Sequence, residues 1–278
     1  MGVIITTDTT DIPITMIGQY AGECWGANTQ DHEKNYNRGL DCIKCNHGRT
    51  LEFPQIYMKI SGYSARVIRE LYTHIGGGPT RLQSSTRYID YNNFEYITPR
   101  KINGPALELY QKTMKNIAEA ATELKETYGV AKEDAALLLP LGMESTIVIR
   151  TNLRNLIDMS HQRLCTRANW EFRKLMREII DALDFYSDEW KVLIRDLNVF
   201  VPKCKVLGYC PETYSCASKL TPHSAKDRDF LIDFATEAIL SLDELAVGNL
   251  DFDDFYEHLF ELRKKAPIKS QYAEDEEE

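Results

Sequence analysis

The segment from Pro105 to Tyr128 constrains the fold of this chain most strongly. Proline is favoured at the first position of a helix and glycine just after its end, where Gly129 stands. The apolar residues between them recur at helical spacing along one stripe: Leu107, Tyr110, Met114, Ile117, Ala121 and Leu124. The pattern predicts a long amphipathic helix that packs this stripe against a core.

Shorter helical and strand-like segments surround this helix. Residues 51–60 and 145–150 carry β-forming residues, which predicts strands, and residues 3–20 suggest a strand and a turn. Helical spacing predicts helices over residues 34–46, 64–74, 152–163 and 165–183, with Ser64 and Asn152 as N-caps. The glycines at 76–78 and Pro79 end the second of these helices, so residues 81–88 are predicted to form a loop.

The chain changes character after Trp190. Residues 201–224 are punctuated by cysteine and proline, and two helical stretches follow at 226–248 and 251–265. We therefore predict a main domain over residues 1–200 and a cysteine-containing helical extension over 201–265. Residues 266–278 end in the acidic run AEDEEE and are predicted to be a disordered tail.

The overall charge limits the partners of the chain. A net charge of -9 and a pI near 5.3 argue against a general nucleic-acid binder, because affinity for the phosphate backbone needs a basic surface. No apolar run reaches the roughly 20 residues of a membrane-spanning helix, and the N-terminus lacks a basic start and a long apolar segment. We expect a cytoplasmic protein with no membrane contact.

Seven cysteines without a secretory signal make a disulfide scaffold improbable. Cys204, Cys210 and Cys216 follow one another at six-residue steps and are candidate zinc ligands. The missing fourth ligand would be His223 or a cysteine of the pair Cys42 and Cys45. Buried or idle thiols are the alternative interpretation.

The common catalytic signatures for phosphate loops, nucleophile elbows and zinc proteases are absent from the sequence. Two distant segments instead combine arginine with small hydrogen-bonding side chains. Arginine offers planar, bidentate donors that suit phosphates and carbonyl-bearing bases, so two converging sets would suit a nucleotide. Ordinary surface arginines are the alternative. The first set is Arg81, Ser84, Ser85 and Arg87, and the second is Asn152, Arg154, Arg163 and Arg167.

Several motifs, read in order, resemble the flavin-dependent thymidylate synthase family. They are NHGRTLEF at 46–53, Ser64-x-Arg66, His74, QSSTRY at 83–88, LLLPLG at 137–142 and NLRNLIDMSHQRLCTRANWEFR at 152–173. The last motif is the most specific, because its asparagine, arginines, Ala168, Trp170 and Glu171 stand at the family's spacings. The resemblance covers about residues 40–180. It implies an α+β fold with a mixed sheet packed with long helices, and a homotetramer whose active sites form between subunits.

The resemblance also implies an activity, the reductive methylation of dUMP to dTMP. FAD would be the cofactor, with methylenetetrahydrofolate and NADPH as co-substrates. The residues matching the nucleotide site are Arg81, Gln83, Ser84, Ser85, Thr86, Arg87 and Arg163, of which Ser85, Arg87 and Arg163 would act on the reacting dUMP. Ser85 would be a binding hydroxyl and not a nucleophile. The residues matching flavin-side positions are His47, Glu52, His74, Asn152, Arg154, Asp158 and Arg167.

The chain departs from the family pattern at three places. The Arg-His-Arg signature is replaced by Thr73-His74-Ile75, Ala136 stands where an arginine is usual, and Arg167 stands where a histidine is common. Arg66, Arg69, Arg81 and the backbone N–H groups of the glycine loop are candidates to compensate. Two alternatives stay open: a flavin and folate enzyme acting on another uridylate, and a non-catalytic interaction protein on the same scaffold.

Overall fold

A computed structural model describes residues 2–216, 218–223, 225–246, 254, 255 and 258. These residues divide into two compact units, one of residues 1–164 and 168–200 and one of residues 165–167 and 201–278. The predicted roles of the two units, a catalytic domain and an extension, stay predictions. No helix in the described ranges combines the length and apolar character needed to cross a bilayer.

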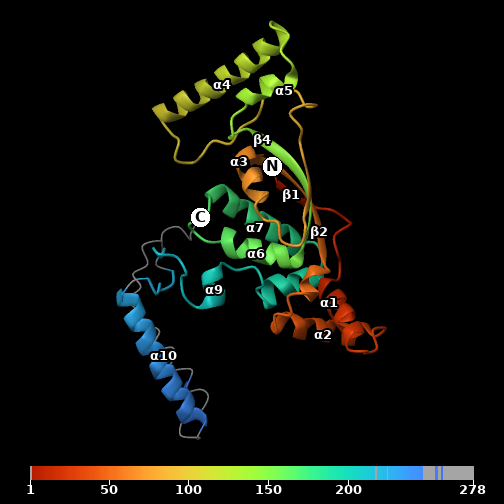
Figure 1. Ribbon diagram of the computed structural model, residues 1–278, viewed down its shortest axis with the longest axis vertical. Coiled ribbons are helices and arrows are strands. Elements are labelled where there is room, and N and C mark those ends of the chain that lie inside the picture. Colours follow the sequence, from red (N-terminus) through yellow and green to blue (C-terminus); the bar gives the residue numbers. More distant parts are fainter. Residues whose placement is uncertain (1, 217, 224, 247–253, 256–257, 259–278) are drawn as a thin grey trace. The chain divides into compact units, whose positions relative to one another are not determined.

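A four-stranded sheet lies at the centre of the first unit (Figure 1). Its strands are β1 (Gly2–Ile5), β2 (Gln55–Ser64), β3 (Thr80–Gln83) and β4 (Glu144–Asn152), in the order β1-β2-β4-β3. Every pairing is antiparallel. The predicted α+β class is therefore confirmed, but the sheet is antiparallel where a mixed sheet was expected.

Among the described residues, most of the helices belong to the first unit, and two belong to the second. The first unit contains α1 (Pro13–Cys24), α2 (His32–Lys44), η1 (Thr50–Glu52), α3 (Ala65–Leu71), α4 (Pro105–Glu126), α5 (Lys132–Ala135), η2 (Ala136–Leu138), α6 (Leu153–Arg163), α7 (Trp170–Asp184), α8 (Asp188–Lys191) and the π-helical turn η3 (Val192–Asp196). The second unit contains α9 (Lys203–Leu207) and α10 (Ala225–Ala246). The predicted helix at 251–265 lies largely outside the described residues.

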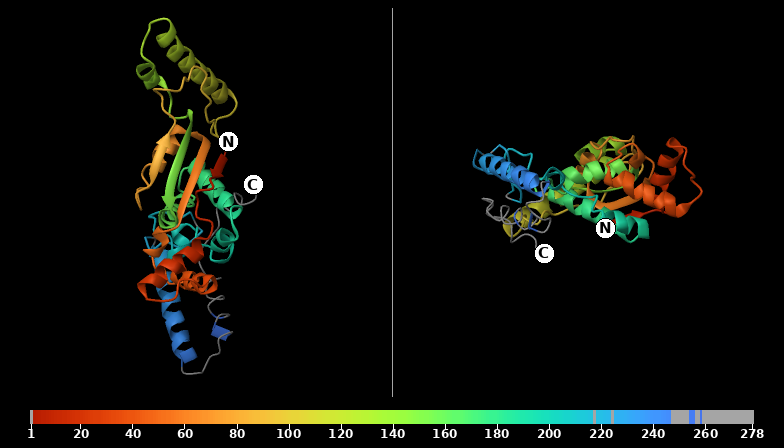
Figure 2. Two further views of the ribbon diagram at one scale, coloured as in Figure 1. Left: turned by 90° about the vertical axis from the view of Figure 1, so that its right-hand side faces the viewer. Right: turned by 90° about the horizontal axis from the view of Figure 1, so that it is seen from below.

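One face of the sheet forms the main core. Alternate residues of β2 and β4 are fully buried there, and α6 and α7 run side by side along this face (Figures 1 and 2). The helices contribute Leu156, Phe172, Leu175, Met176 and Ile179, all with side chains at most 1% exposed. Each such side chain stabilises the fold by roughly 1.5–3 kcal/mol relative to leaving it exposed. The packing fixes the ends of α3, α6 and α7 relative to one another.

The opposite face of the sheet is open in the single chain. Ile4, Lys59, Val148 and Leu82 form one row across all four strands. The three apolar residues of this row are 60%, 44% and 74% exposed in that order.

Three local predictions differ from the structure. Residues 13–24 form a helix where a strand and turn were expected, because Pro13 opens a turn that buries Ile14 and Ile17. Residues 80–83 form an edge strand and not a loop, since they pair with β4. Helix α7 begins at Trp170 and not near Cys165, because the Asn169 side chain accepts a hydrogen bond from a backbone N–H and caps it there.

The long helix predicted over 105–128 is present as α4, and Ser64 caps α3 as predicted. The stripe of α4 does not join the main core. Met114 packs with Phe94 and Met143 in a small separate cluster, and most of the helix surface is exposed. Amphipathic spacing predicted the helix and its buried side, but not which core receives it.

Candidate functional site

Arg163 and His74 form the centre of the candidate site. Arg163 is the last residue of α6, and its Nε donates to Nε2 of His74 at 2.9 Å. Its Nη1 donates to Oε2 of Glu70 at 3.1 Å, and its guanidinium lies 4.5 Å from the ring centre of Phe172. The side chain of Arg163 is only 18% exposed. These contacts hold the guanidinium in one orientation, as a donor that positions a ligand must be held.

His74 is neutral at physiological pH. Its side chain is buried, with 7% of the residue exposed. Burial and, to a smaller extent, the positive charges of Arg163 and Arg81 lower the pKa of His74 to about 4, and the negative charge of Glu70 opposes them. Because Nε2 accepts the hydrogen bond from Arg163, the proton of the neutral ring resides on Nδ1.

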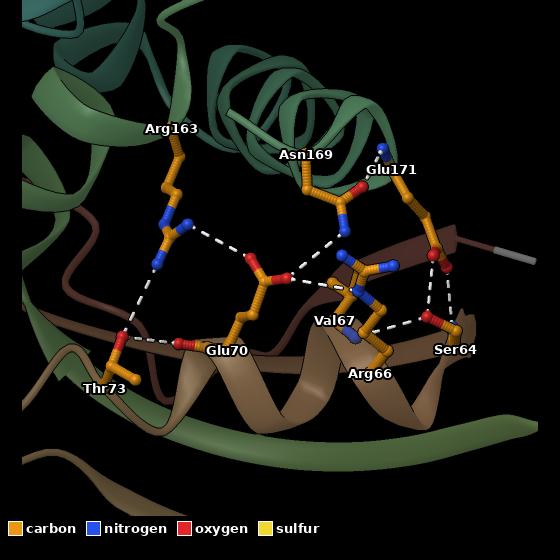
Figure 3. A network of polar contacts seen from close by, with 8 residues as sticks. All are labelled: Ser64, Arg66, Val67, Glu70, Thr73, Arg163, Asn169 and Glu171. Carbon is orange, nitrogen blue, oxygen red and sulfur yellow. Dashed lines mark hydrogen bonds and ion pairs between the residues drawn. The ribbon is translucent and has the colours of Figure 1, made fainter. Parts of the chain in front are cut away.

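Glu70 is a carboxylate shared by several donors, as Figure 3 shows. It accepts from Arg163, from Nδ2 of Asn169 at 3.3 Å, and forms an ion pair with Nε of Arg66 at 3.6 Å. One anion therefore faces two arginines, and with Arg81 beside His74 the arginines outnumber the carboxylates Glu70 and Glu171. An excess of positive charge in a partly buried cluster favours an anionic ligand.

A second carboxylate holds the beginning of α3. Glu171 is 5% exposed and accepts from both the backbone N–H and the hydroxyl of Ser64, each at 2.6 Å (Figure 3). The Ser64 oxygen in turn accepts from the N–H of Val67 at 3.2 Å. Hydrogen bonds to a buried charged group contribute about 1.5–3 kcal/mol each. The start of α7 thus holds α3 in place, and with it His74 just beyond its end.

The glycine loop packs directly against the beginning of α6. A Cβ atom on Gly77 would lie 2.0 Å from Nδ2 of Asn152, and one on Gly76 would lie 2.8 Å from Oδ1 of Asn155. Gly77 also has a φ of +67°, which side chains disfavour. The glycines therefore permit a close approach, and this approach brings Asn152 near the segment that carries His74.

Arg81 reaches back to the end of α3. Its Nη2 donates to the carbonyl oxygens of Leu71 and His74, and its guanidinium lies 5.1 Å from the ring centre of Tyr72. Free carbonyl groups at a helix end are stabilised by such a cation. Burial lowers the pKa of Arg81. The predicted contact of Arg81 with a nucleotide phosphate stays a prediction, since these donors serve the helix end in the single chain.

The hydroxyl loop begins as an extension of the sheet. Nε2 of Gln83 donates to Oγ of Ser145 at 3.0 Å, and the N–H of Ser84 donates to the carbonyl of Thr146 at 2.8 Å. These two predicted substrate residues are thus fixed by the edge of β4.

The rest of the hydroxyl loop lies against α5. Oγ of Ser85 accepts from the N–H of Arg87 at 3.2 Å, and Nε of Arg87 lies 2.8 Å from Oε2 of Glu133. Thr86 lines a small pocket together with Lys132 and Ala135 of α5. Arg87 and Arg163, the two predicted nucleotide anchors, share no contact within the described part of the chain.

The predicted flavin-side residues form a second group. Nη1 of Arg154 donates to Oε1 of Glu52 at 2.7 Å, and a Cβ on Gly48 would come within 3.2 Å of the Arg154 guanidinium carbon. His47 is the residue before that glycine. Asp158 is exposed one helical turn after Arg154 on α6. The structure therefore brings Arg154 together with Glu52 and the His47 segment, which lie about a hundred positions earlier in the chain.

Arg167 and the predicted metal ligands belong to the second unit. Arg167 donates to the carbonyl of Tyr214 at 2.8 Å and lies 3.8 Å from Glu212. Its predicted flavin contact stays a prediction. No feature of the sequence predicted that Arg167 belongs to the second unit, because the spacing of the motif alone suggested a place beside Arg163.

The predicted zinc ligands Cys204, Cys210 and Cys216 have free thiols. Burial raises the pKa of Cys204, as do the neighbouring thiols, among them Cys165, which was not predicted as a ligand. Within the described ranges, no three or more His, Cys, Asp or Glu side chains are arranged to hold a metal ion. The predicted zinc site stays a prediction.

Sequence reasoning missed three residues of the site. Glu70, Asn169 and Phe172 complete the surroundings of Arg163. A signal for Glu70 was present, since a carboxylate one turn after Arg66 and one turn before His74 lies on the same side of the predicted helix. The contacts that Asn169 and Phe172 make with residues of other helices could not be predicted from the spacing of the motifs.

Comparison with known proteins defines the family of this chain and the class of its fold. A family model described as thymidylate synthase complementing protein matches residues 7–184. The structure resembles the crystal structure of the flavin-dependent thymidylate synthase ThyX from Helicobacter pylori complexed with FAD and dUMP. The TM-score is 0.56 at 19% identity, over 70% of this chain and 99% of that one. This likeness concerns the fold.

Sequence relatives carry the same name. The flavin-dependent thymidylate synthase of Pyrococcus abyssi is 34% identical over 172 residues, which is 60% of this chain and 68% of the relative. That of Nitratidesulfovibrio vulgaris is 28% identical over 186 residues, 61% of this chain and 70% of the relative. The chain belongs to the flavin-dependent thymidylate synthase family, which confirms the family resemblance of the motifs.

Proposed function

We propose that this chain catalyses the reductive methylation of dUMP to dTMP with FAD as its cofactor. Methylenetetrahydrofolate supplies the carbon in this proposal and NADPH the reducing equivalents. The observation that carries it is the clamped guanidinium of Arg163, held by His74 and Glu70 inside the region that matches the family. The cluster is positively charged and partly buried, as binding of a nucleotide monophosphate requires.

The protein's own groups bind and orient dUMP. Arg163 and Arg87 are the proposed anchors, whose N–H groups hold the phosphate or polarise the ring carbonyl groups as negative charge develops on the pyrimidine. Ser85 contributes a binding hydroxyl. Neutral His74 positions Arg163 without adding a positive charge. No protein nucleophile is needed, since the carbon and the hydride come from bound ligands.

The second group of residues suits the flavin. Arg154 and His47 offer donors beside Glu52, and Asn152 lies at the start of α6 where its helix dipole favours an anion. Asp158 and Arg167 are the further proposed contacts. When bound, FAD supplies the hydride chemistry. These side chains would hold it, and the donor set fits carbonyl and phosphate groups.

The chain is proposed to be a divergent member of the family without the Arg-His-Arg signature. Thr73 and Ile75 stand in place of the two arginines, and Ile75 is 75% exposed. Arg66 and Arg81 supply positive charge on either side of His74 instead. This substitution is the reason to keep a second candidate, a flavin and folate enzyme acting on another uridylate.

A homotetramer with active sites between subunits is part of the proposal. In the single chain Arg87 pairs with Glu133, whereas Arg163 pairs with His74 and Glu70. Assembly from two subunits would supply the nucleotide with an Arg87 and an Arg163 from different chains. The exposed row of Ile4, Val148 and Leu82 offers a surface for such assembly. The predicted cytoplasmic location stays a prediction.

Two measurements on the purified protein test the proposal. Its visible spectrum should show flavin absorbance, either as purified or after addition of FAD. Release of hydrogen from C5 of dUMP should then require both NADPH and methylenetetrahydrofolate. A protein that binds FAD but releases nothing from dUMP would favour another uridylate. A protein that binds no FAD at tens of micromolar would favour a non-catalytic interaction protein.

A further inference from the structure

A small pocket beside the hydroxyl loop brings two lysines next to the predicted nucleotide residues. This α5 pocket lies where α5 meets α4 (Figure 1), and its lining includes Thr86 of the loop, Lys125 in the last turn of α4, Lys132 and Ala136. All of the residues that line it are described, and the two lysines are the charged ones among them. Its composition suits an anionic group, since lysine ammonium groups bind phosphate as point charges.

Lys132 and Ala136 lie on the same side of the α5 pocket. They are four positions apart, which is about one helical turn, and α5 continues directly into η2. Ala136 presents only a methyl group, at one of the places where the chain departs from the family pattern. The positive charge on this side of the pocket therefore comes from Lys132.

Among the described residues, the two lysines share a single carboxylate. Nζ of Lys125 donates to Asp90 and to Oδ1 of Asn92, and Nζ of Lys132 lies 3.5 Å from Oδ2 of Asp90. The hydrogen bond from Lys125 and the charges of both lysines lower the pKa of Asp90, so this carboxylate is ionised at neutral pH. Two positive charges thus face one negative charge, and one remains for a ligand.

The two lysines differ in what they can still bind. An ammonium group has three N–H donors. Lys125, whose side chain is 13% exposed, gives donors to Asp90 and Asn92. The side chain of Lys132 is 38% exposed, and Asp90 is the one partner of its ammonium group in the described part of the chain. Lys132 is therefore the cation that can reach a ligand, while Lys125 holds Asp90.

Arg87 meets α5 next to Lys132. Its Nε lies 2.8 Å from Oε2 of Glu133, and its side chain is 66% exposed. The residues that precede these two in the sequence, Thr86 and Lys132, both line the α5 pocket. The guanidinium of Arg87 and the ammonium group of Lys132 therefore belong to one contact between the loop and α5. With Lys125, three cations face the two carboxylates at this contact.

We propose that Lys132 binds the phosphate group of the nucleotide substrate, together with Arg87 of the hydroxyl loop. A phosphate monoester carries about 1.5–2 negative charges at pH 7, and the surplus positive charge of this contact attracts it. This inference rests on the proposed function. It adds a cation to the proposed dUMP site and assigns the phosphate to the part of the site formed by the loop and α5.

The test measures the Kd of dUMP by equilibrium titration of full-length variants. Lys132→Ala should raise this Kd about five- to twentyfold, near the lower end expected for a hydrogen bond to a charged group, because the side chain is partly exposed. Lys132→Arg keeps the charge and should retain most of the affinity. Lys115→Ala is the matched control, because this lysine of α4 is 77% exposed and pairs with Glu119. Its Kd should equal that of the wild-type protein, and the content of FAD should be the same in all variants.

Two further measurements separate an effect of charge from an effect of structure. The loss of affinity in Lys132→Ala should become smaller as the salt concentration rises, since salt screens an exposed charge. Asp90→Asn should lower the Kd of dUMP about two- to fivefold, because it removes the negative charge that competes with the phosphate for Lys132. Asparagine can still accept the hydrogen bond from Lys125.

Several results would overturn the proposal. They are an unchanged Kd in Lys132→Ala, an equal loss of affinity in Lys132→Arg, and a loss that salt does not reduce. Weaker binding of dUMP by Asp90→Asn would also overturn it, and this variant keeps the test decisive if Lys132→Ala does not fold.

Failure of the proposed function would give a different result. A protein that binds dUMP but releases no C5 hydrogen would contradict that function, while the Kd values would still test Lys132. If dUMP does not bind to the wild-type protein, the same titrations use UMP, a uridylate with the same phosphate group. Weaker binding of UMP by Lys132→Ala would then support the proposal. Equal binding in all variants, or no binding of either nucleotide, would overturn it.

Discussion

Replacing His74 should remove a pH dependence of stability that the wild-type protein shows below neutrality. The pKa of His74 is lowered from 6.5 to about 4 by burial and by the neighbouring arginines. Between these two values the unfolded chain binds a proton at His74 and the folded protein does not. Stability contributed at this position is therefore complete above pH 6.5 and is lost as the pH falls toward 4.

The size of the loss follows from the two pKa values. The lowering of the pKa from 6.5 to about 4 corresponds to a loss of unfolding free energy of roughly 1 kcal/mol at pH 5.5 and roughly 2–3 kcal/mol at pH 4.5, relative to pH 8. Full protonation at lower pH would bring the loss to roughly 3 kcal/mol. Since the residue is 7% exposed, solvent screens this effect little.

Urea denaturation of the wild-type protein and of His74→Gln at pH 8, 5.5 and 4.5 measures this effect. Glutamine can accept the hydrogen bond from Arg163 but does not titrate. The unfolding free energy of the wild-type protein minus that of His74→Gln should therefore decrease by the amounts above as the pH falls. The same measurements on His32→Gln, a change at the first residue of α2, serve as the control for replacing a histidine elsewhere in the unit. A pH-independent difference between wild type and His74→Gln would refute the assignment of a neutral, buried His74.

Three further predictions concern the site and its support. Arg87→Ala and Arg163→Ala should each weaken dUMP binding by about 1.5–3 kcal/mol in equilibrium titrations, as for hydrogen bonds to a charged group; unchanged affinity in both would contradict the site. Glu171→Ala should lower the unfolding free energy by about 3–5 kcal/mol, because two buried donors of Ser64 lose their acceptor; a loss below about 1 kcal/mol in denaturation would contradict this role. Gly77→Ala should lower the affinity for FAD in fluorescence titrations, since its Cβ would displace Asn152; Gly78→Ala has open space and should have less effect on the position of Asn152.

The sequence predicted those parts of the fold that local signals define. The N-cap of α3 and the extent of α4 follow from short-range rules about serine, proline and apolar spacing. The residues 13–24 and 80–83 were misjudged because their structure depends on distant partners. Glu189 accepts hydrogen bonds from the N–H groups of Ile14 and Thr15 at the start of α1, more than 170 positions away in the chain.

For the candidate site, too, the sequence predicted what local patterns define and missed what depends on distant partners. Motif spacing selected His74, Arg163, Glu52 and Arg154 as functional residues, and the structure joins them as two pairs. Spacing placed Glu70 on the same side of the predicted helix as Arg66 and His74, but it gave no indication that this carboxylate would accept a hydrogen bond from Arg163 on another helix. Electrostatic partners across helices depend on how α3, α6 and α7 cross, and that crossing is decided by buried side chains rather than by the motif itself.

The proposed replacement of the two signature arginines by Thr73 and Ile75 has a consistent electrostatic explanation. Arg81 uses its N–H donors on the carbonyl groups at the end of α3, but its charge still acts on His74 and helps to lower its pKa. A hydrogen bond needs contact, whereas a charge in a partly buried region acts over several ångströms. Arg66 and Arg81 can therefore keep the region beside Arg163 positive although Thr73 and Ile75 carry no charge. The site retains its attraction for an anion and changes only which N–H groups can touch it. Discrimination between dUMP and another uridylate should accordingly depend on direct contacts at Thr73 and Ile75 more than on the overall field.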